Sequence, residues 1–127
     1  MADLLDQLTR RLSLLAGVDQ GESMFGNGVA CWVNGKEVAH FEAPGMIEVR
    51  LTKAVIRELR SSLKSDSRVV FRPSGADWLT VHFATTADVD FIVELVSEAE
   101  QAHRPPPGVT SKPPPTGADL ERRKRFH

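Results

Sequence analysis

Apolar residues recur at three- and four-residue steps in three segments, which is the spacing of an amphipathic helix. The first segment is 3–16, where Asp3 is placed to cap the helix and Gly17 follows its end. The second is 53–63, and the third runs from Thr85 to about residue 102. The predicted buried stripes are Leu5, Leu8, Leu12 and Leu15; Val55, Ile56, Leu59 and Leu63; and Phe91, Ile92, Leu95, Val96 and Ala99.

Short apolar runs and alternating segments between the helices predict five β-strands. They lie at 29–33, 36–43, 46–51, 69–71 and 78–84. Asn34-Gly35 favours a two-residue type I′ hairpin, because both residues tolerate positive φ. Pro44-Gly45 favours a type II corner. The polar segment 18–28 holds three glycines and is predicted to be a loop.

The resulting order is α-β-β-β-α-β-β-α, which is typical of an α+β domain with a mostly antiparallel sheet of about five strands. The helices are expected on one face, and the other face is then open to water. An exposed edge strand would also suit a homodimer.

Residues 104–127 differ in character from 1–103. Two Pro-Pro-Pro runs, at 105–107 and 113–115, favour extended polyproline II, and few apolar residues follow them. We therefore predict one domain over 1–103 and a disordered, proline-rich basic tail over 104–127.

Charge separates the same two parts. The net charge is −1. Residues 1–103 have ten Lys or Arg and fifteen Asp or Glu, whereas residues 104–127 have six Lys or Arg and two Asp or Glu, so the domain is acidic and the tail is basic. Cys31 is the only cysteine, which excludes an intramolecular disulfide and a cysteine zinc cage and favours a reducing compartment. No apolar run approaches the about 20 residues of a membrane span, and no secretory signal is seen, so we expect a cytoplasmic protein.

Strand alternation assigns a set of aromatic and polar residues to the open sheet face. If the aliphatic residues of the strands point at the helices, the opposite face carries the predicted ligand-binding set: Trp32, His40, Glu48, Arg50, Trp78 and His82, with Thr80 between the last two. Aromatic rings with convergent polar groups suit a small ligand or a protein partner. A solvated face with tryptophans packed across strands is the plainer alternative.

Other chemistry receives less support from the residues. His40 and His82 could join Glu42 or Glu48 in a metal or acid–base site, but no spacing demands it, and we predict no metal and no cofactor. An enzyme with His40 as acid or base is the least favoured function. Cys31 lies in an apolar strand, where burial raises a thiol pKa and makes the group inert.

A basic stripe supports an alternative function. Lys53, Arg57, Arg60 and Lys64 share one face of the second predicted helix, where they could contact the phosphates of a nucleic acid. The basic end of the tail, 122–125, could assist. The negative domain opposes strong nucleic-acid binding, and a solvated helix face explains the stripe equally well.

The central segment also resembles a known family. The stretch 35–40 (GKEVAH) leads to 44–51 (PGMIEVRL), and 72–81 (RPSGADWLTV) follows. These stretches resemble a bacterial family of unknown function labelled "luciferase domain" and, distantly, the YjbR/MmcQ group of small α+β proteins. The residues that match the pattern are Glu37, His40, Arg50, Leu51 and Trp78.

The family label implies light emission or flavin chemistry, but no residues suited to hold a flavin are found here. The distant group implies a DNA-binding motif, which would fit the basic helix. Where family members carry a second histidine before the last strand, this chain has Phe71-Arg72-Pro73. The favoured function is a non-enzymatic binding or interaction domain that uses the open sheet face.

Overall fold

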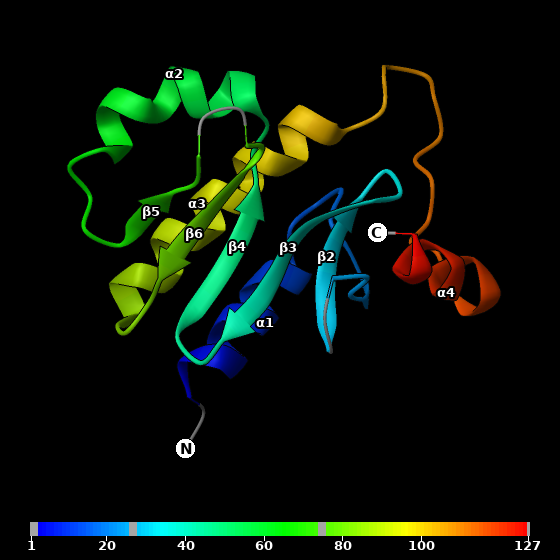
Figure 1. Ribbon diagram of the computed structural model, residues 1–127, viewed down its shortest axis with the longest axis horizontal. Helices are drawn as coiled ribbons and strands as arrows, with labels where there is room; N and C mark the ends of the chain where they lie inside the picture. Colours follow the sequence, from blue (N-terminus) through cyan, green and yellow to red (C-terminus); the bar gives the residue numbers. More distant parts are fainter. Residues whose placement is uncertain (1–2, 26–27, 74–75, 127) are drawn as a thin grey trace.

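The computed structural model describes residues 3–25, 28–73 and 76–126, and it has one antiparallel sheet of six strands in the order β1-β2-β3-β4-β6-β5 (Figure 1). The elements are α1 (Leu4–Ser13), β1 (Asp19–Glu22), β2 (Val29–Val33), β3 (Lys36–Ala43), β4 (Met46–Arg50), α2 (Lys53–Leu63), β5 (Val69–Phe71), β6 (Trp78–His82), α3 (Thr86–His103) and α4 (Gly117–Arg125). The predicted α+β class is confirmed. No helix in the described part of the chain is long and apolar enough to cross a membrane.

Helices α1 and α3 pack on one face of the sheet, behind the strands in Figure 1. The strand residues predicted to point inward meet them there, because alternate residues of a strand point to the same side. The core joins helix residues to strand residues: Leu8, Leu12, Ile92, Val96, Cys31, Val33, Ile47, Val49, Leu79 and Val81. Val29 and Leu5 were predicted to be buried, and this was wrong, since their exposed fractions are 54% and 44%.

The predicted turns and caps hold the elements in register. Asn34 and Gly35 both have positive φ, 50° and 77°, as the type I′ hairpin requires. Gly45 has a φ of 73°, which fits the predicted type II corner. Thr85 and Asp88 form the reciprocal hydrogen bonds of a capping box at the start of α3.

Strand β1 corrects the prediction of a loop over 18–28. Residues 19–22 pair with β2, with Asp19 opposite Trp32 and Glu22 opposite Val29. Backbone pairing with β2 forms this strand, and apolar side chains do not contribute to it. Three of its four residues are exposed, and the fourth, Gly21, is half-buried. The hydrophobic pattern therefore could not reveal it.

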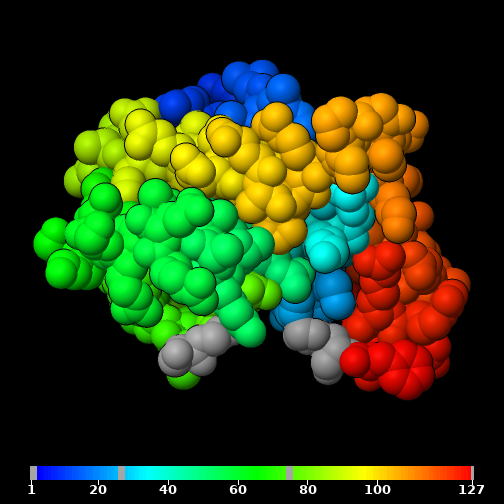
Figure 2. Space-filling view, turned by 90° about the horizontal axis from the view of Figure 1, so that it is seen from above, coloured from blue at the N-terminus to red at the C-terminus, as the bar shows by residue number. Residues whose placement is uncertain are grey.

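The segment after His103 contains a helix, where a disordered tail was predicted. This helix lies on the other face of the sheet, whereas all helices were predicted to share one face. The segment ends in α4, whose Leu120 is 4% exposed and packs against Ala30 and Trp32 of β2. These two residues point away from the core that α1 and α3 cover. Figure 2 shows red α4 on one side of the molecule and blue α1 with yellow α3 on the other. The outer face is thus closed over β2, where Trp32 would otherwise expose a large apolar ring.

Polar contacts also hold the C-terminal segment in place. The Lys112 amide donates to Asn34 Oδ1 at 3.0 Å, and Arg123 donates to the Gly35 carbonyl at 3.1 Å. Lys124 forms an ion pair with Glu22. The positive tail thus meets the hairpin tip and the acidic edge strand of its own domain.

We expect Leu120→Ala to detach α4 from the sheet. Truncating a buried leucine costs about 2–5 kcal/mol. Because α4 can detach while the rest of the domain stays folded, the free energy of global unfolding falls by no more than the free energy of docking this segment. Hydrogen exchange at the α4 amides should accelerate, and Trp32 emission should shift to longer wavelength. Val109→Ala, at an exposed site in the same segment, is the control. Unchanged α4 exchange in Leu120→Ala would contradict this packing.

Candidate functional site

A bulge in β3 places two polar side chains on the open face of the sheet. Ala39 pairs with Cys31 and Glu37 pairs with Trp32, so Val38 is an extra residue in β3. Val38 and Ala39 both enter the core, and the alternation of side chains shifts by one position. Glu37 and His40 therefore share the open face, whereas a regular strand would place Glu37 in the core.

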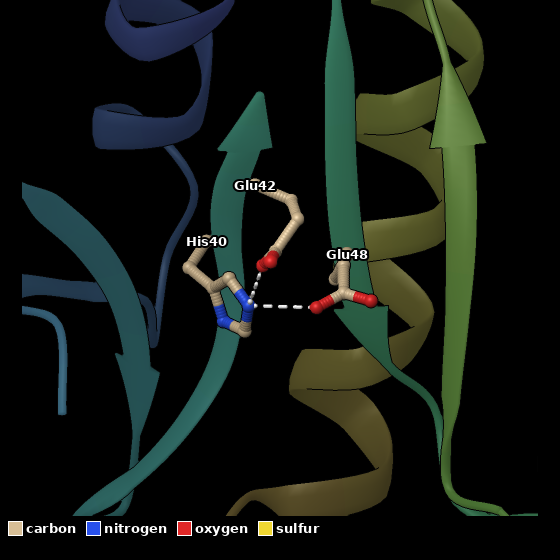
Figure 3. Close-up of side chains that lie close together, drawn as sticks. All are labelled: His40, Glu42 and Glu48. Atoms are coloured by element: carbon tan, nitrogen blue, oxygen red, sulfur yellow. Dashed lines mark hydrogen bonds and ion pairs between the residues drawn. The ribbon is translucent and has the colours of Figure 1, made fainter. Parts of the chain in front are cut away.

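A second irregularity lies on the other side of His40. Phe41 pairs with Ile47 and Ala43 with Met46, which leaves Glu42 as an extra residue. Its carboxylate Oε2 lies 3.3 Å from His40 Nε2. Glu48 of β4, opposite His40 in the sheet, brings its Oε1 to 2.9 Å from the same nitrogen (Figure 3). Two carboxylates thus converge on one ring nitrogen.

Glu37 is a fully buried carboxylate with hydrogen bonds to the segment that follows β1. Its Oε2 accepts from the Ser23 hydroxyl at 2.7 Å, and its Oε1 accepts from the Met24 amide at 2.6 Å. Its Oε2 also lies 3.0 Å from His40 Nδ1, although the direction does not suit a hydrogen bond, and this buried Nδ1 has no hydrogen-bond partner among the described residues. Glu37 therefore positions both the loop and the imidazole.

Aromatic rings enclose the imidazole. Its centroid lies 5.4 Å from the Phe25 ring and 5.0 Å from the Trp78 ring, and Phe25 meets Trp78 edge-on. The Arg50 guanidinium lies over the Trp78 ring at 5.6 Å, within cation–π range. His40 is only 6% exposed as a result.

The structure brings together four of the six residues predicted for the open face. His40, Glu48, Arg50 and Trp78 lie in one cluster through these contacts. Trp32 does not join this cluster. It is fully buried under α4, where no ligand could reach it. His82 is exposed and pairs with Met46 at the other end of β4, about 13 Å along the strand from Trp78 at 3.3 Å per residue.

A basic pocket adjoins this cluster at the end of the sheet. It has a volume of about 270 Å³ and lies between α2 and the β5–β6 hairpin. Its basic lining comprises Lys53, Arg57, Arg60 and Arg72, and its apolar and remaining lining comprises Ile56, Phe71, Pro73, Ala76, Trp78 and Leu79. Lys64, the fourth residue of the predicted basic stripe, does not line it. Strand alternation could not predict this pocket, because it combines a helix face with a turn.

Arg72 and Trp78 connect the pocket to the histidine cluster. Arg72 forms an ion pair with Glu48, whose Oε2 also accepts from the Thr80 hydroxyl at 3.3 Å. Trp78 contacts His40 and lines the pocket. Glu48 is 6% exposed, so the Arg72 guanidinium compensates its charge, and its oxygens contact His40 Nε2 and the Thr80 hydroxyl rather than water.

The arrangement can hold a cation on one side and an anion on the other. His40, Glu42 and Glu48 each offer one ligand atom, and these atoms lie within 4.8 Å of one another. The guanidinium and ammonium groups of the pocket suit phosphate or carboxylate. Strand alternation missed Glu37, Phe25 and Arg72 as parts of the site. The available signal for Glu37 was its place among the residues that match the family pattern.

The fold and this cluster define a small α+β domain with a buried histidine and carboxylates on the outer face of an antiparallel sheet. Residues 35–99, about half of the chain, match the family described as Luciferase domain, so the chain belongs to this family. The matched segment contains the whole histidine–carboxylate cluster and the pocket. No curated protein and no solved structure matches the chain. The distant likeness to the YjbR/MmcQ group stays a prediction.

We expect Glu37→Gln to destabilise the domain by about 1–3 kcal/mol, because an amide cannot accept from both the Ser23 hydroxyl and the Met24 amide. Urea unfolding measures the change. Glu42→Gln is the matched control, since the Glu42 side chain is 54% exposed, and it should stay within about 0.5 kcal/mol of the wild type. Equal stability of the two variants would contradict the role of Glu37.

Cys31 should be unreactive in the folded protein. Burial, and then the charge of Glu37, raise the pKa of its thiol to about 12. Relative to a thiol of pKa 9.0, the thiolate population near pH 8 falls by about a thousandfold. Ellman's reagent should therefore react with Cys31 only as fast as the domain opens, and urea should accelerate the reaction. Labelling of the native protein at the rate of a free thiol would contradict this burial.

Proposed function

We propose that this chain is a small binding domain whose ligand is an anion with an apolar or aromatic part. The anionic group would occupy the basic pocket between α2 and the β5–β6 hairpin. The apolar part would lie against Trp78, at the end of the open sheet face. This function unites the predicted ligand face with the basic stripe of α2.

The observation that carries the proposal is a set of cations without counter-ions. Lys53, Arg57 and Arg60 form no ion pair with any described residue. The described residues that line the pocket include no carboxylate. Like charges gathered in a concave site raise its potential and attract an anion. Lys53 begins α2, and its backbone amide donates to Asp77 Oδ1 at 3.0 Å, so that carboxylate already caps the helix while the Lys53 ammonium stays unpaired among the described residues.

The apolar part of the pocket supports a ligand larger than an inorganic ion. The Arg60 guanidinium lies over the Phe71 ring at 4.6 Å, and Trp78 and Leu79 contribute further apolar surface. A volume of about 270 Å³ is close to the lower end of ordinary ligand pockets, about 300 Å³. A small phosphorylated or carboxylated aromatic compound would fill it.

Nucleic-acid binding, the alternative, receives less support. Lys64 lies outside the pocket, so the basic stripe is divided. Two basic residues of α4, Arg123 and Lys124, have partners in Gly35 and Glu22 of the same chain. A recessed pocket suits a compact anion better than a continuous phosphate backbone, which needs an extended charged surface.

The test is calorimetric titration with phenyl phosphate and inorganic phosphate. Phenyl phosphate should bind more tightly, because its ring removes apolar pocket surface from water, and it should change Trp78 emission. The double variant Arg57→Gln, Arg60→Gln should weaken binding by about tenfold or more, since hydrogen bonds to charged groups contribute about 1.5–3 kcal/mol each.

Lys64→Gln is the matched control on the same helix and should bind phenyl phosphate like the wild type. Equal loss of affinity in this control would mean that general charge, and not the pocket, attracts the anion. Tight binding of single-stranded DNA that falls steeply with salt and needs Lys64 would favour the nucleic-acid function instead.

A further inference from the structure

We propose that His40, Glu42 and Glu48 bind a divalent transition-metal ion, in a site separate from the anion pocket. The sequence predicted no metal here, because no ligand spacing demanded one. In the structure, strand pairing sets Glu48 opposite His40, and the irregularity at Glu42 brings a second carboxylate to the same ring nitrogen. The inference does not depend on the proposed anion ligand.

The geometry is close to that of a coordination site. Oε1 of Glu48 and Oε2 of Glu42 lie 2.9 Å and 3.3 Å from His40 Nε2, and all three atoms fall within 4.8 Å of one another. In a tetrahedral site with bonds of about 2.1 Å, ligand atoms are about 3.4 Å apart. Small side-chain rotations would therefore admit an ion between them. Figure 3 shows both carboxylates directed at the same ring nitrogen of His40.

The charges around the imidazole favour a divalent ion. Three carboxylates, from Glu37, Glu42 and Glu48, lie within 3.3 Å of its two nitrogens. Arg72 is the one other cation in the described part of the chain that forms an ion pair with any of them. A neutral imidazole leaves a charge of −2, and a protonated one leaves −1. With a neutral imidazole, a divalent ion brings the group to zero, and the buried carboxylates of Glu37 and Glu48 need such compensation.

The surroundings of His40 support a ligand role for Nε2. The side chain is more than nine-tenths buried and fixed between Phe25 and Trp78, and Nε2 faces the two carboxylates. The opposite nitrogen, Nδ1, lies 3.0 Å from the Glu37 carboxylate and has no hydrogen-bond partner within residues 3–25, 28–73 and 76–126. Histidines that bind metals commonly direct their second nitrogen at a carboxylate, which orients the ring.

The ligand set also indicates which ions fit. Imidazole nitrogen suits zinc and other first-row transition metals, whereas Mg²⁺ and Ca²⁺ prefer oxygen alone. The Glu42 side chain is 54% exposed, so one side of the site faces solvent and leaves a position for water or a ligand. We therefore expect Zn²⁺ and Mn²⁺ to bind, and Mg²⁺ to bind much more weakly.

The experiment is a titration of the full chain with Zn²⁺ in competition with a chromophoric chelator. One ion per chain should bind, and saturating Zn²⁺ should raise the melting temperature. Glu42→Gln changes an exposed residue and should leave the fold intact while weakening Zn²⁺ binding by about tenfold or more. A long-range ¹H–¹⁵N spectrum of the histidine rings should show the change at His40 Nε2.

Matched controls separate this site from other ways of binding zinc. Glu94→Gln, an exposed residue of α3, and His82→Gln should retain full affinity. Arg57→Gln with Arg60→Gln should also retain it, which keeps this test distinct from that of the anion pocket. The proposal is overturned if the chain binds no zinc at one equivalent, if Glu42→Gln binds as tightly as the wild type, or if binding is lost in His82→Gln.

Discussion

The bulge at Val38 is the constraint on which the outer face of this domain depends. One extra residue in β3 sends both Val38 and Ala39 into the core, so the polar residues on either side, Glu37 and His40, point outward together. Without it, a carboxylate would point into an apolar core at a cost of several kcal/mol. The bulge thus satisfies the core and assembles the site in the same step.

Each half of the outer face is organised differently around that strand. Over β2, the C-terminal segment supplies Leu120 to cover Trp32, and basic side chains fix the segment to the hairpin and to β1. Over β4 and β6, no helix in the described part of the chain covers this outer face, and Phe25 and Trp78 enclose the imidazole instead. The exposed part of the face consequently comprises the region beside Trp78 and the basic pocket and, at the other end of β4, the surface around His82.

Much of the fold could be predicted, because it follows from local signals. Asn34-Gly35 fixed the first hairpin, and the Thr85–Asp88 pair marked the start of α3. Strand β1 and helix α4 lack such signals. The β1 residues form a strand only because β2 offers a free edge, and α4 is stabilised by one leucine against a tryptophan about 90 residues earlier in the chain.

The candidate site could be predicted only in part for a related reason. Regular alternation correctly assigned His40, Glu48, Arg50 and Trp78 to one face, since β4 and β6 pair without interruption. It could not assign Glu37, because alternation fails at a bulge. Arg72 reaches Glu48 from a turn, and turns carry no periodic signal. The basic residues of α2 were recognised, but their pocket depends on the packing of a helix against a hairpin.

The most direct test of this account is the register of β2 and β3, measured from cross-strand backbone NOEs in solution. We predict contacts between Cys31 and Ala39 and between Trp32 and Glu37, with Val38 left unpaired. A regular register, in which Trp32 lies opposite Val38, would turn Glu37 into the core and separate it from His40. That result would contradict the assembly of the site.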